Sequence, residues 1–119
     1  MHKDFSYDPS LPELTKLIGN DAALLISFIE PFLPELTEYT VMVPENIKAG
    51  KAQDVARAFH SLKVNAKIFG SESLHELCKE LESKVKSEGL KDASSFEPLF
   101  VRQVQLLRDN LQEKLDSLS

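Results

Sequence analysis

The sequence contains few of the residues that build disulfide frameworks, turn-rich sheets or membrane spans. Its 1 cysteine, Cys78, cannot form an internal disulfide, and no Cys/His spacing resembles a zinc site. A reducing compartment fits this composition, so we expect the protein in the cytoplasm. The 4 glycines are too few for a turn-rich all-β fold. No run of about 18 apolar residues is present and the N-terminus lacks the apolar stretch of a signal peptide, so we expect no membrane insertion.

An excess of basic residues is also absent. The net charge of -5 and the pI near 5.2 argue against a nucleic-acid partner. With 42% hydrophobic and 28% charged residues, the composition is typical of a globular protein. A chain of 119 residues buries one core. We therefore expect a single domain over residues 1–119, with residues 1–10 as a loosely ordered N-terminal segment.

Helical periodicity is what the sequence does have. Apolar residues recur every three or four positions, with punctuation between the segments, and predict helices at about 11–18, 21–48, 51–69, 72–88 and 95–118. Pro31, Pro34 and Pro44 interrupt the second pattern, and an interior proline costs roughly 3 kcal/mol, so we expect a kink or break near 31–34. Short loops and no period-2 alternation predict an all-α fold, an antiparallel up-and-down four-helix bundle with a short extra N-terminal helix.

His60 is the candidate functional residue of the third predicted helix. The apolar stripe of that helix comprises Val55, Ala58, Phe59, Leu62, Ala66 and Phe69. His60 falls about 160° from the centre of this stripe, so it should be exposed. Lys63 and Lys67 share its face, with Ala56 and Val64 one turn to either side. A surface histidine without a role is one interpretation; the other is a ring accessible to a docking protein, beside cations that favour an anion.

The chemistry suited to such a ring is nucleophilic. A neutral imidazole is a nucleophile near pH 7 because its unperturbed pKa is about 6.5. A phosphoryl group on one ring nitrogen would need a nearby cation, and Lys63 lies one turn away. A carboxylate accepting a hydrogen bond from the other nitrogen would orient the ring, and Glu82 is a candidate on the next helix.

These residues form a recognisable signature. The stretch HSLKVNAKIFGSESLHELCKELE, residues 60–82, resembles the histidine-containing phosphotransfer (HPt) domain family: H-x-L-K-G, a glycine, then L-x-x-L-C-x-x-L-E. The matching positions are His60, Leu62, Lys63, Gly70, Leu74, Leu77, Cys78, Leu81 and Glu82. Val64 departs from the family pattern, which has glycine four residues after the histidine. The likeness covers nearly the whole chain.

The resemblance implies a phosphoryl carrier in a two-component multistep phosphorelay. His60 would take a phosphoryl group from a receiver-domain aspartate of a response regulator and pass it to another receiver. Consistent with the family, the chain has neither a phosphate-binding glycine loop nor kinase motifs. We therefore expect a phosphoryl carrier that is not an enzyme and has no kinase or ATP site of its own. The expected partners are receiver domains and a hybrid sensor histidine kinase. We expect no cofactor of its own, Mg²⁺ in the partner receiver, and a monomer.

The resemblance also assigns roles to residues. His60 would be the phosphorylated nucleophile, Lys63 its charge-stabilising neighbour and Glu82 the group that orients the imidazole. The docking residues would be Ala56, Val64, Lys67, Gly70, Lys86 and Phe32, with Gly70 also ending its helix. No metal site is expected. Two questions stay open: whether the aromatic surface around Phe28 and Phe32 is core or docking patch, and whether Val64 marks an adaptor that binds a receiver without phosphorylation.

Overall fold

The computed structural model describes residues 4–119, and the regular secondary structure in that range consists of α-helices, without strands. The helices are α1 (Pro12–Ile18), α2 (Ala22–Lys48), α3 (Ala52–Ile68), α4 (Glu72–Glu88) and α5 (Ala93–Leu118). The prediction of an all-helical bundle is confirmed. No helix in this range is both long and apolar enough to cross a membrane.

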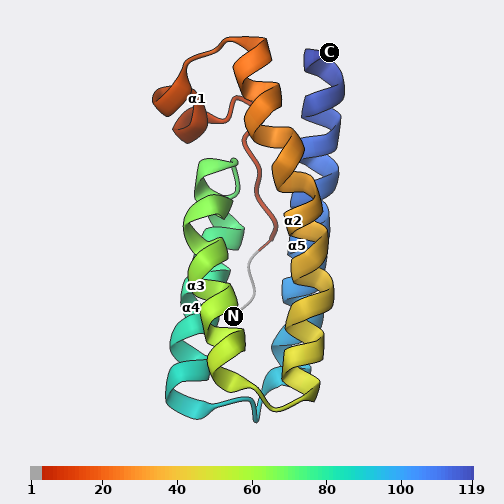
Figure 1. Cartoon of the computed structure of the whole chain (residues 1–119). Helices are drawn as coiled ribbons and strands as arrows, with labels where there is room; N and C mark the ends of the chain where they lie inside the picture. Colours follow the sequence, from red (N-terminus) through yellow and green to blue (C-terminus); the bar gives the residue numbers. More distant parts are fainter. Residues whose placement is uncertain (1–3) are drawn as a thin grey trace.

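The four long helices lie side by side along one axis, and α1 lies at one end of them (Figure 1). Successive long helices run in opposite directions, with both α3 and α5 ascending in this view. The molecule is therefore elongated, with principal extents of 44 × 21 × 21 Å. The most extensive packing joins α3 to α4 and α2 to α5. The pair α3 and α4 carries the candidate site.

Helix α2 is one continuous element, so of the kink or break expected near 31–34 the break is wrong. Two of its three prolines lie where the cost of a missing hydrogen bond is small. Pro31 and Pro34 are exposed, and so are Ser27 and Glu30, whose carbonyls would have accepted the missing N–H groups. Those carbonyls face solvent, where water can serve as the donor. Burial of the opposite face then keeps the helix on the core.

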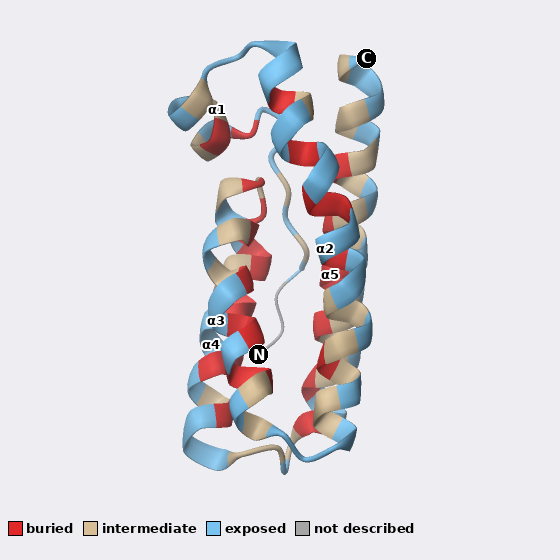
Figure 2. Cartoon of the chain, in the orientation of Figure 1, coloured by how far each residue is buried: buried red, intermediate tan, exposed pale blue. Residues whose placement is uncertain are grey.

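The core follows the predicted stripes closely, and Figure 2 shows the buried residues on the inner faces of the long helices. All six stripe residues of the third predicted helix are buried, and so are the apolar residues on the inner face of α4: Leu74, Leu77, Cys78, Leu81 and Val85. Phe59 sits at the centre, with its ring edge-on to Phe96 and Phe100 at centroid distances of 6.1 and 5.0 Å. Two apolar residues at the helical spacing of buried neighbours are exposed instead: Phe28 of α2 at 45% and Leu17 of α1 at 68%.

The N-terminal segment was expected to be loosely ordered over residues 1–10, of which residues 1–3 lie outside the described range. Residues 4–10 form no helix but are hydrogen-bonded to the bundle. The backbone N–H of Ser6 donates to Ser73 Oγ at 2.7 Å, and that of Asp8 donates to the carbonyl of Gly70 at 2.9 Å. These bonds tie the segment to the turn between α3 and α4.

Candidate functional site

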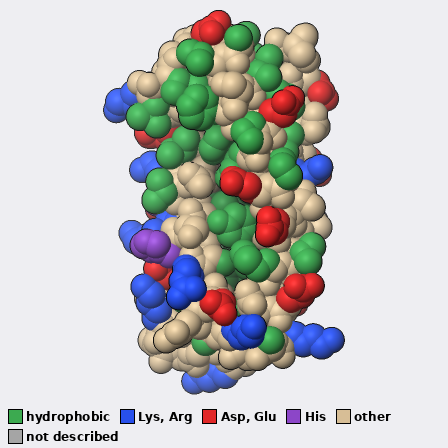
Figure 3. Space-filling view, viewed as in Figure 1, with side chains coloured by type: hydrophobic (Ala, Val, Ile, Leu, Met, Phe, Trp, Pro, Cys, Tyr) green, Lys and Arg blue, Asp and Glu red, His purple; other side chains and the backbone are tan. Residues whose placement is uncertain are grey.

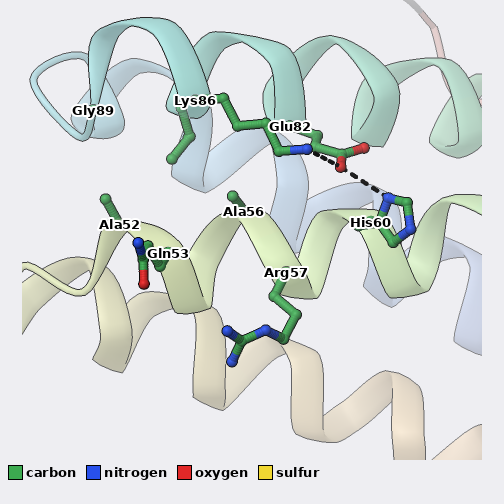
Figure 4. Close-up of a pocket in the computed structure, with 9 residues that line it drawn as sticks. Ala52, Gln53, Ala56, Arg57, His60, Glu82, Lys86 and Gly89 are labelled. Atoms are coloured by element: carbon green, nitrogen blue, oxygen red, sulfur yellow. Dashed lines mark hydrogen bonds and ion pairs between the residues drawn. The ribbon is translucent and has the colours of Figure 1, made fainter.

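The site begins with His60, which projects from the middle of α3 with 66% of its side chain exposed. The helical periodicity predicts this exposure, because the apolar stripe that contains Phe59 and Leu62 faces the core and His60 lies on the other side of the helix. The ring is not free to rotate: Nδ1 lies 2.8 Å from Glu82 Oε2 on α4 (Figure 4). The structure therefore brings together the two residues that the sequence could only suggest as partners.

Glu82 is a buried carboxylate between two helices, with 8% of its side chain exposed. Hydrogen bonds from Lys63, Lys86 and His60 outweigh the opposing effect of burial and lower the pKa of Glu82 from 4.5 to about 2. An ionised carboxylate only accepts hydrogen bonds, so His60 Nδ1 carries the proton of the neutral ring. The lone pair then lies on Nε2, which is the nitrogen able to attack an electrophile.

Two lysines complete the cluster around the carboxylate. Lys63 Nζ donates to Oε1 at 2.8 Å, and Lys86 Nζ donates to Oε2 at 2.9 Å. Lys63 is largely enclosed, with 22% of its side chain exposed, whereas Lys86 is 65% exposed. With one carboxylate and two ammonium groups, the cluster keeps a net positive charge. It is suited to an additional anion at the ring.

The turn between α3 and α4 sets the register that lets Glu82 reach His60. Gly70 adopts φ +97°, a conformation that L side chains rarely take, and ends α3. Ser71 then caps α4, its Oγ accepting from the N–H of Leu74 at 3.1 Å. The glycine stop agrees with the role that the family resemblance gives to Gly70.

His75 contributes a contact that the sequence did not reveal. Its Nδ1 donates to the backbone carbonyl of Lys63 at 2.8 Å, because a carbonyl can only accept. The half-buried ring thus fastens α4 to α3 at the residue whose side chain holds Glu82. This hydrogen bond gives His75 a structural role.

The predicted docking residues lie in different environments. Val64 is 55% exposed and follows His60 by one turn, and Lys67 is exposed one turn further along α3. Ala56 is 7% exposed yet lines a groove beside His60. Gly70 lies at the far end of α3, packed against the backbone of Asp8.

The placement of Phe32 on the docking face needs correction. Its ring is 3% exposed and stacks on Phe69 with centroids 4.2 Å apart, so it belongs to the core. Phe28, one turn earlier, is the exposed aromatic of α2. The open question about this surface therefore has a different answer for different residues. Ile29, Phe32 and Leu33 belong to the core, whereas Phe28 faces solvent.

A groove of about 780 Å³ runs between α3 and α4 and starts at His60. Its floor consists of small or buried side chains, Ala52, Ala56 and Val85, and it ends at Gly89. Arg57 and Lys86 stand at its sides. The groove was not predicted, although the spacing of Ala52, Ala56 and His60 by four residues is a signal that places them on one face.

The site thus combines an exposed histidine on a helical bundle with a buried carboxylate that holds one ring nitrogen and with two flanking lysines. A family model described as the Hpt domain matches residues 27–118, most of the chain. The chain belongs to the Hpt domain family. Domains of this family transfer phosphoryl groups on histidine in phosphorelays, act as carriers rather than kinases, and interact with receiver domains and kinases. Neither the search of curated proteins nor that of solved structures returned a match.

Proposed function

We propose that this chain is a phosphorelay intermediate in which His60 Nε2 carries the phosphoryl group. The observation that carries the proposal is the 2.8 Å contact between His60 Nδ1 and the ionised Glu82 carboxylate on a ring that is otherwise exposed. The contact assigns the proton to Nδ1 and the nucleophilic lone pair to the solvent-facing side of the ring. An antiparallel four-helix scaffold, in which α3 and α4 are neighbours, supplies that geometry.

The transfer step is a displacement at phosphorus. The Nε2 lone pair attacks the phosphorus of an aspartyl phosphate on a receiver domain, an N–P bond forms, and the P–O bond to the aspartate breaks. The aspartate leaves as a carboxylate, and the ring becomes an imidazolium that still carries the Nδ1 proton. Glu82 stabilises this cation through the existing hydrogen bond. Transfer to a second receiver is the same step in reverse.

Each neighbour has a role in this proposal. Glu82 orients the ring and supports its developing positive charge. Lys63 and Lys86 offset the negative charge that the phosphoryl group brings, because both ammonium groups lie within hydrogen-bonding distance of the carboxylate that holds the ring. Mg²⁺ belongs to the receiver partner, and the chain acts without a cofactor of its own. A monomer leaves the His60 face free for successive partners.

Surface composition supports docking next to His60. Figure 3 shows a histidine at the edge of one face, with Lys or Arg side chains beside it. Hydrophobic side chains, with Asp and Glu among them, gather over the upper and middle parts of that face. Val64 is one of the exposed large hydrophobic residues, together with Leu17, Leu24, Phe28 and Val41. Exposed apolar side chains of this size are typical of interaction surfaces.

Val64 also motivates an alternative function. Its exposed isopropyl group stands where the family pattern has glycine, one turn after His60. A bulky side chain there could keep a receiver too far away for transfer while preserving binding, which would make the chain an adaptor.

Replacement of His60 by glutamine separates the two functions. Glutamine cannot carry phosphate on a ring nitrogen but keeps a polar side chain at an exposed position. We expect H60Q to lose all transfer from a phosphorylated receiver while its affinity for that receiver changes less than about threefold, because the docking surface remains. A wild-type chain that binds receivers and takes no phosphate from them would instead support the adaptor.

A further inference from the structure

We propose that the first turns of α4 form a binding site for a divalent transition-metal ion, with Glu72, His75 and Glu76 as ligands and Zn²⁺ as the ion that suits them. None of these residues takes part in the proposed phosphoryl transfer. The inference therefore stands independently of that function.

The three side chains meet because of their spacing on one helix. Glu72, His75 and Glu76 occupy positions i, i+3 and i+4 of α4, which places them on one face. Each offers a ligand atom, and these atoms all lie within 4.8 Å of one another. Donor atoms around a tetrahedral Zn²⁺ lie roughly 3.4 Å apart, so small rotations of the glutamate side chains close the site. A Glu-x-x-His pair on one helix also supplies metal ligands in other helical bundles.

The ring of His75 is already oriented as a metal ligand. Its Nδ1 donates to the backbone carbonyl of Lys63 at 2.8 Å, so the lone pair of the neutral ring lies on Nε2. Histidines that bind metals almost always donate their other N–H to a carbonyl or a carboxylate, which fixes the ring and makes the ligating nitrogen more basic. The hydrogen bond thus supplies from α3 the support that a metal ligand on α4 needs.

The two carboxylates carry charge that the described part of the chain does not neutralise. Neither Glu72 nor Glu76 forms an ion pair within residues 4–119, although Lys79 lies one turn further along α4. Glu82 on the same helix, by contrast, is paired with two lysines. Neighbouring carboxylates repel each other, and a divalent cation between them would replace that repulsion with attraction.

The ligand set also selects the class of ion. One imidazole and two carboxylates suit Zn²⁺, whereas Mg²⁺ and Ca²⁺ prefer oxygen ligands alone and need more of them. Three protein ligands leave a fourth position for water. The sequence predicted no metal site because it lacks paired cysteines and histidines, and here the carboxylates take the place of the missing ligands.

The test is a calorimetric titration of the full, untagged chain with Zn²⁺, and with Mg²⁺ for comparison. We compare the wild type with E72Q/E76Q, which keeps the shape of both side chains and removes their charge. The matched control is E35Q/E38Q on α2, which makes the same charge change at two exposed positions without a histidine between them.

Two further variants separate the two histidines. Asparagine in H75N can still donate its amide N–H to the Lys63 carbonyl, but it has no counterpart of Nε2. H60Q removes the exposed ring beside Glu82, the other place where an imidazole and a carboxylate lie together. Circular dichroism checks that each variant keeps the helical content of the wild type.

We expect the wild type to bind one Zn²⁺ per chain and to bind Mg²⁺ much more weakly. E72Q/E76Q and H75N should weaken Zn²⁺ binding at least about tenfold, because each removes ligands of the ion, whereas E35Q/E38Q and H60Q should change the affinity less than about twofold. Equal affinity in all five proteins, a loss confined to H60Q, or no binding up to about 1 mM Zn²⁺ would overturn the site.

A measurement on the wild type alone gives an answer that needs no folded variant. The ¹⁵N signals of the imidazole rings are recorded by NMR during the Zn²⁺ titration. We expect the Nε2 signal of His75 to shift in step with the calorimetric binding, while the Nδ1–H of His75 remains protonated. A His75 ring whose signals do not move while Zn²⁺ binds would rule out this site.

Discussion

Substitution of Glu82 by glutamine provides a quantitative check on the electrostatics of the site. Glutamine has nearly the same shape but no charge, so it removes the ionic part of the bonds from His60, Lys63 and Lys86. The displacement of the Glu82 pKa from 4.5 to about 2 corresponds to about 3 kcal/mol of stabilisation of the charged form. Two of the three donors are about two-thirds exposed, so screening reduces the expected loss in unfolding free energy to about 1–2 kcal/mol at pH 7.

The sign of the pH dependence follows from the direction of this pKa displacement. The pKa of Glu82 is lower in the folded than in the unfolded state, so its stabilising contribution is complete above about pH 5. The contribution is lost as the pH falls from 4.5 towards 2, because the unfolded state binds a proton first. The wild type should therefore lose its advantage over E82Q within this range.

Urea unfolding followed by far-UV circular dichroism between pH 7 and pH 2 measures the difference. The control is E88Q, which removes an exposed carboxylate from the same helix, 3.8 Å from Lys91. We expect this control to change the unfolding free energy by less than about 0.5 kcal/mol at any pH. A wild-type advantage over E82Q that stays constant from pH 7 to pH 2, or is absent at pH 7, would refute the reasoning.

Three other predictions follow from the same geometry. K63A should slow phosphoryl transfer about tenfold to a hundredfold with unchanged helical content, because a charge-assisted hydrogen bond contributes about 1.5–3 kcal/mol; an unchanged rate would remove Lys63 from the mechanism. E82Q should weaken phosphorylation without abolishing it and allow the other tautomer of His60, visible in ¹⁵N NMR; a single Nδ1–H tautomer in both proteins would count against the orienting role. G70A should lower the unfolding free energy by about 1–3 kcal/mol, since φ is +97° and its Cβ would lie 2.9 Å from the Asp8 carbonyl oxygen. The control G50A, with no atom within 4 Å of its Cβ, should lower it by only about 1 kcal/mol. Equal losses in both variants would show that the N-terminal segment moves aside without cost.

Local patterns in the sequence predict most of the fold. The Ser71 cap and the Gly89 stop define α4 to the residue, and the 3.6-residue period separates exposed His60 from buried Phe59. These signals are local, since they depend on residues within one or two turns. Propensity rules failed for α2, because the cost of a proline depends on whether the carbonyl it leaves unpaired faces water or the core.

Contacts between helices could not be derived in the same way. The sequence proposed Glu82 as a partner of His60, but the contact depends on the turn at Gly70 and on how α4 lies against α3. Phe28 and Phe32 share one apolar pattern, and stacking on Phe69 of the α3–α4 turn is what covers Phe32 and leaves Phe28 exposed. The groove beside His60 is likewise a property of two helices, as its floor combines alanines of α3 with Val85 of α4.

The most direct test of the central claim is to find the phosphate itself. The wild-type chain is incubated with a panel of phosphorylated receiver domains and then analysed by mass spectrometry under conditions that preserve acid-labile phosphohistidine. We predict one phosphoryl group, on His60. It should be absent from H60Q, and the phosphorylated wild type should transfer it to an unphosphorylated receiver. No phosphate on any histidine, despite detectable receiver binding, would contradict the phosphorelay function and identify the chain as an adaptor. Phosphate on His75 instead of His60 would contradict the assignment of His60 as the carrier.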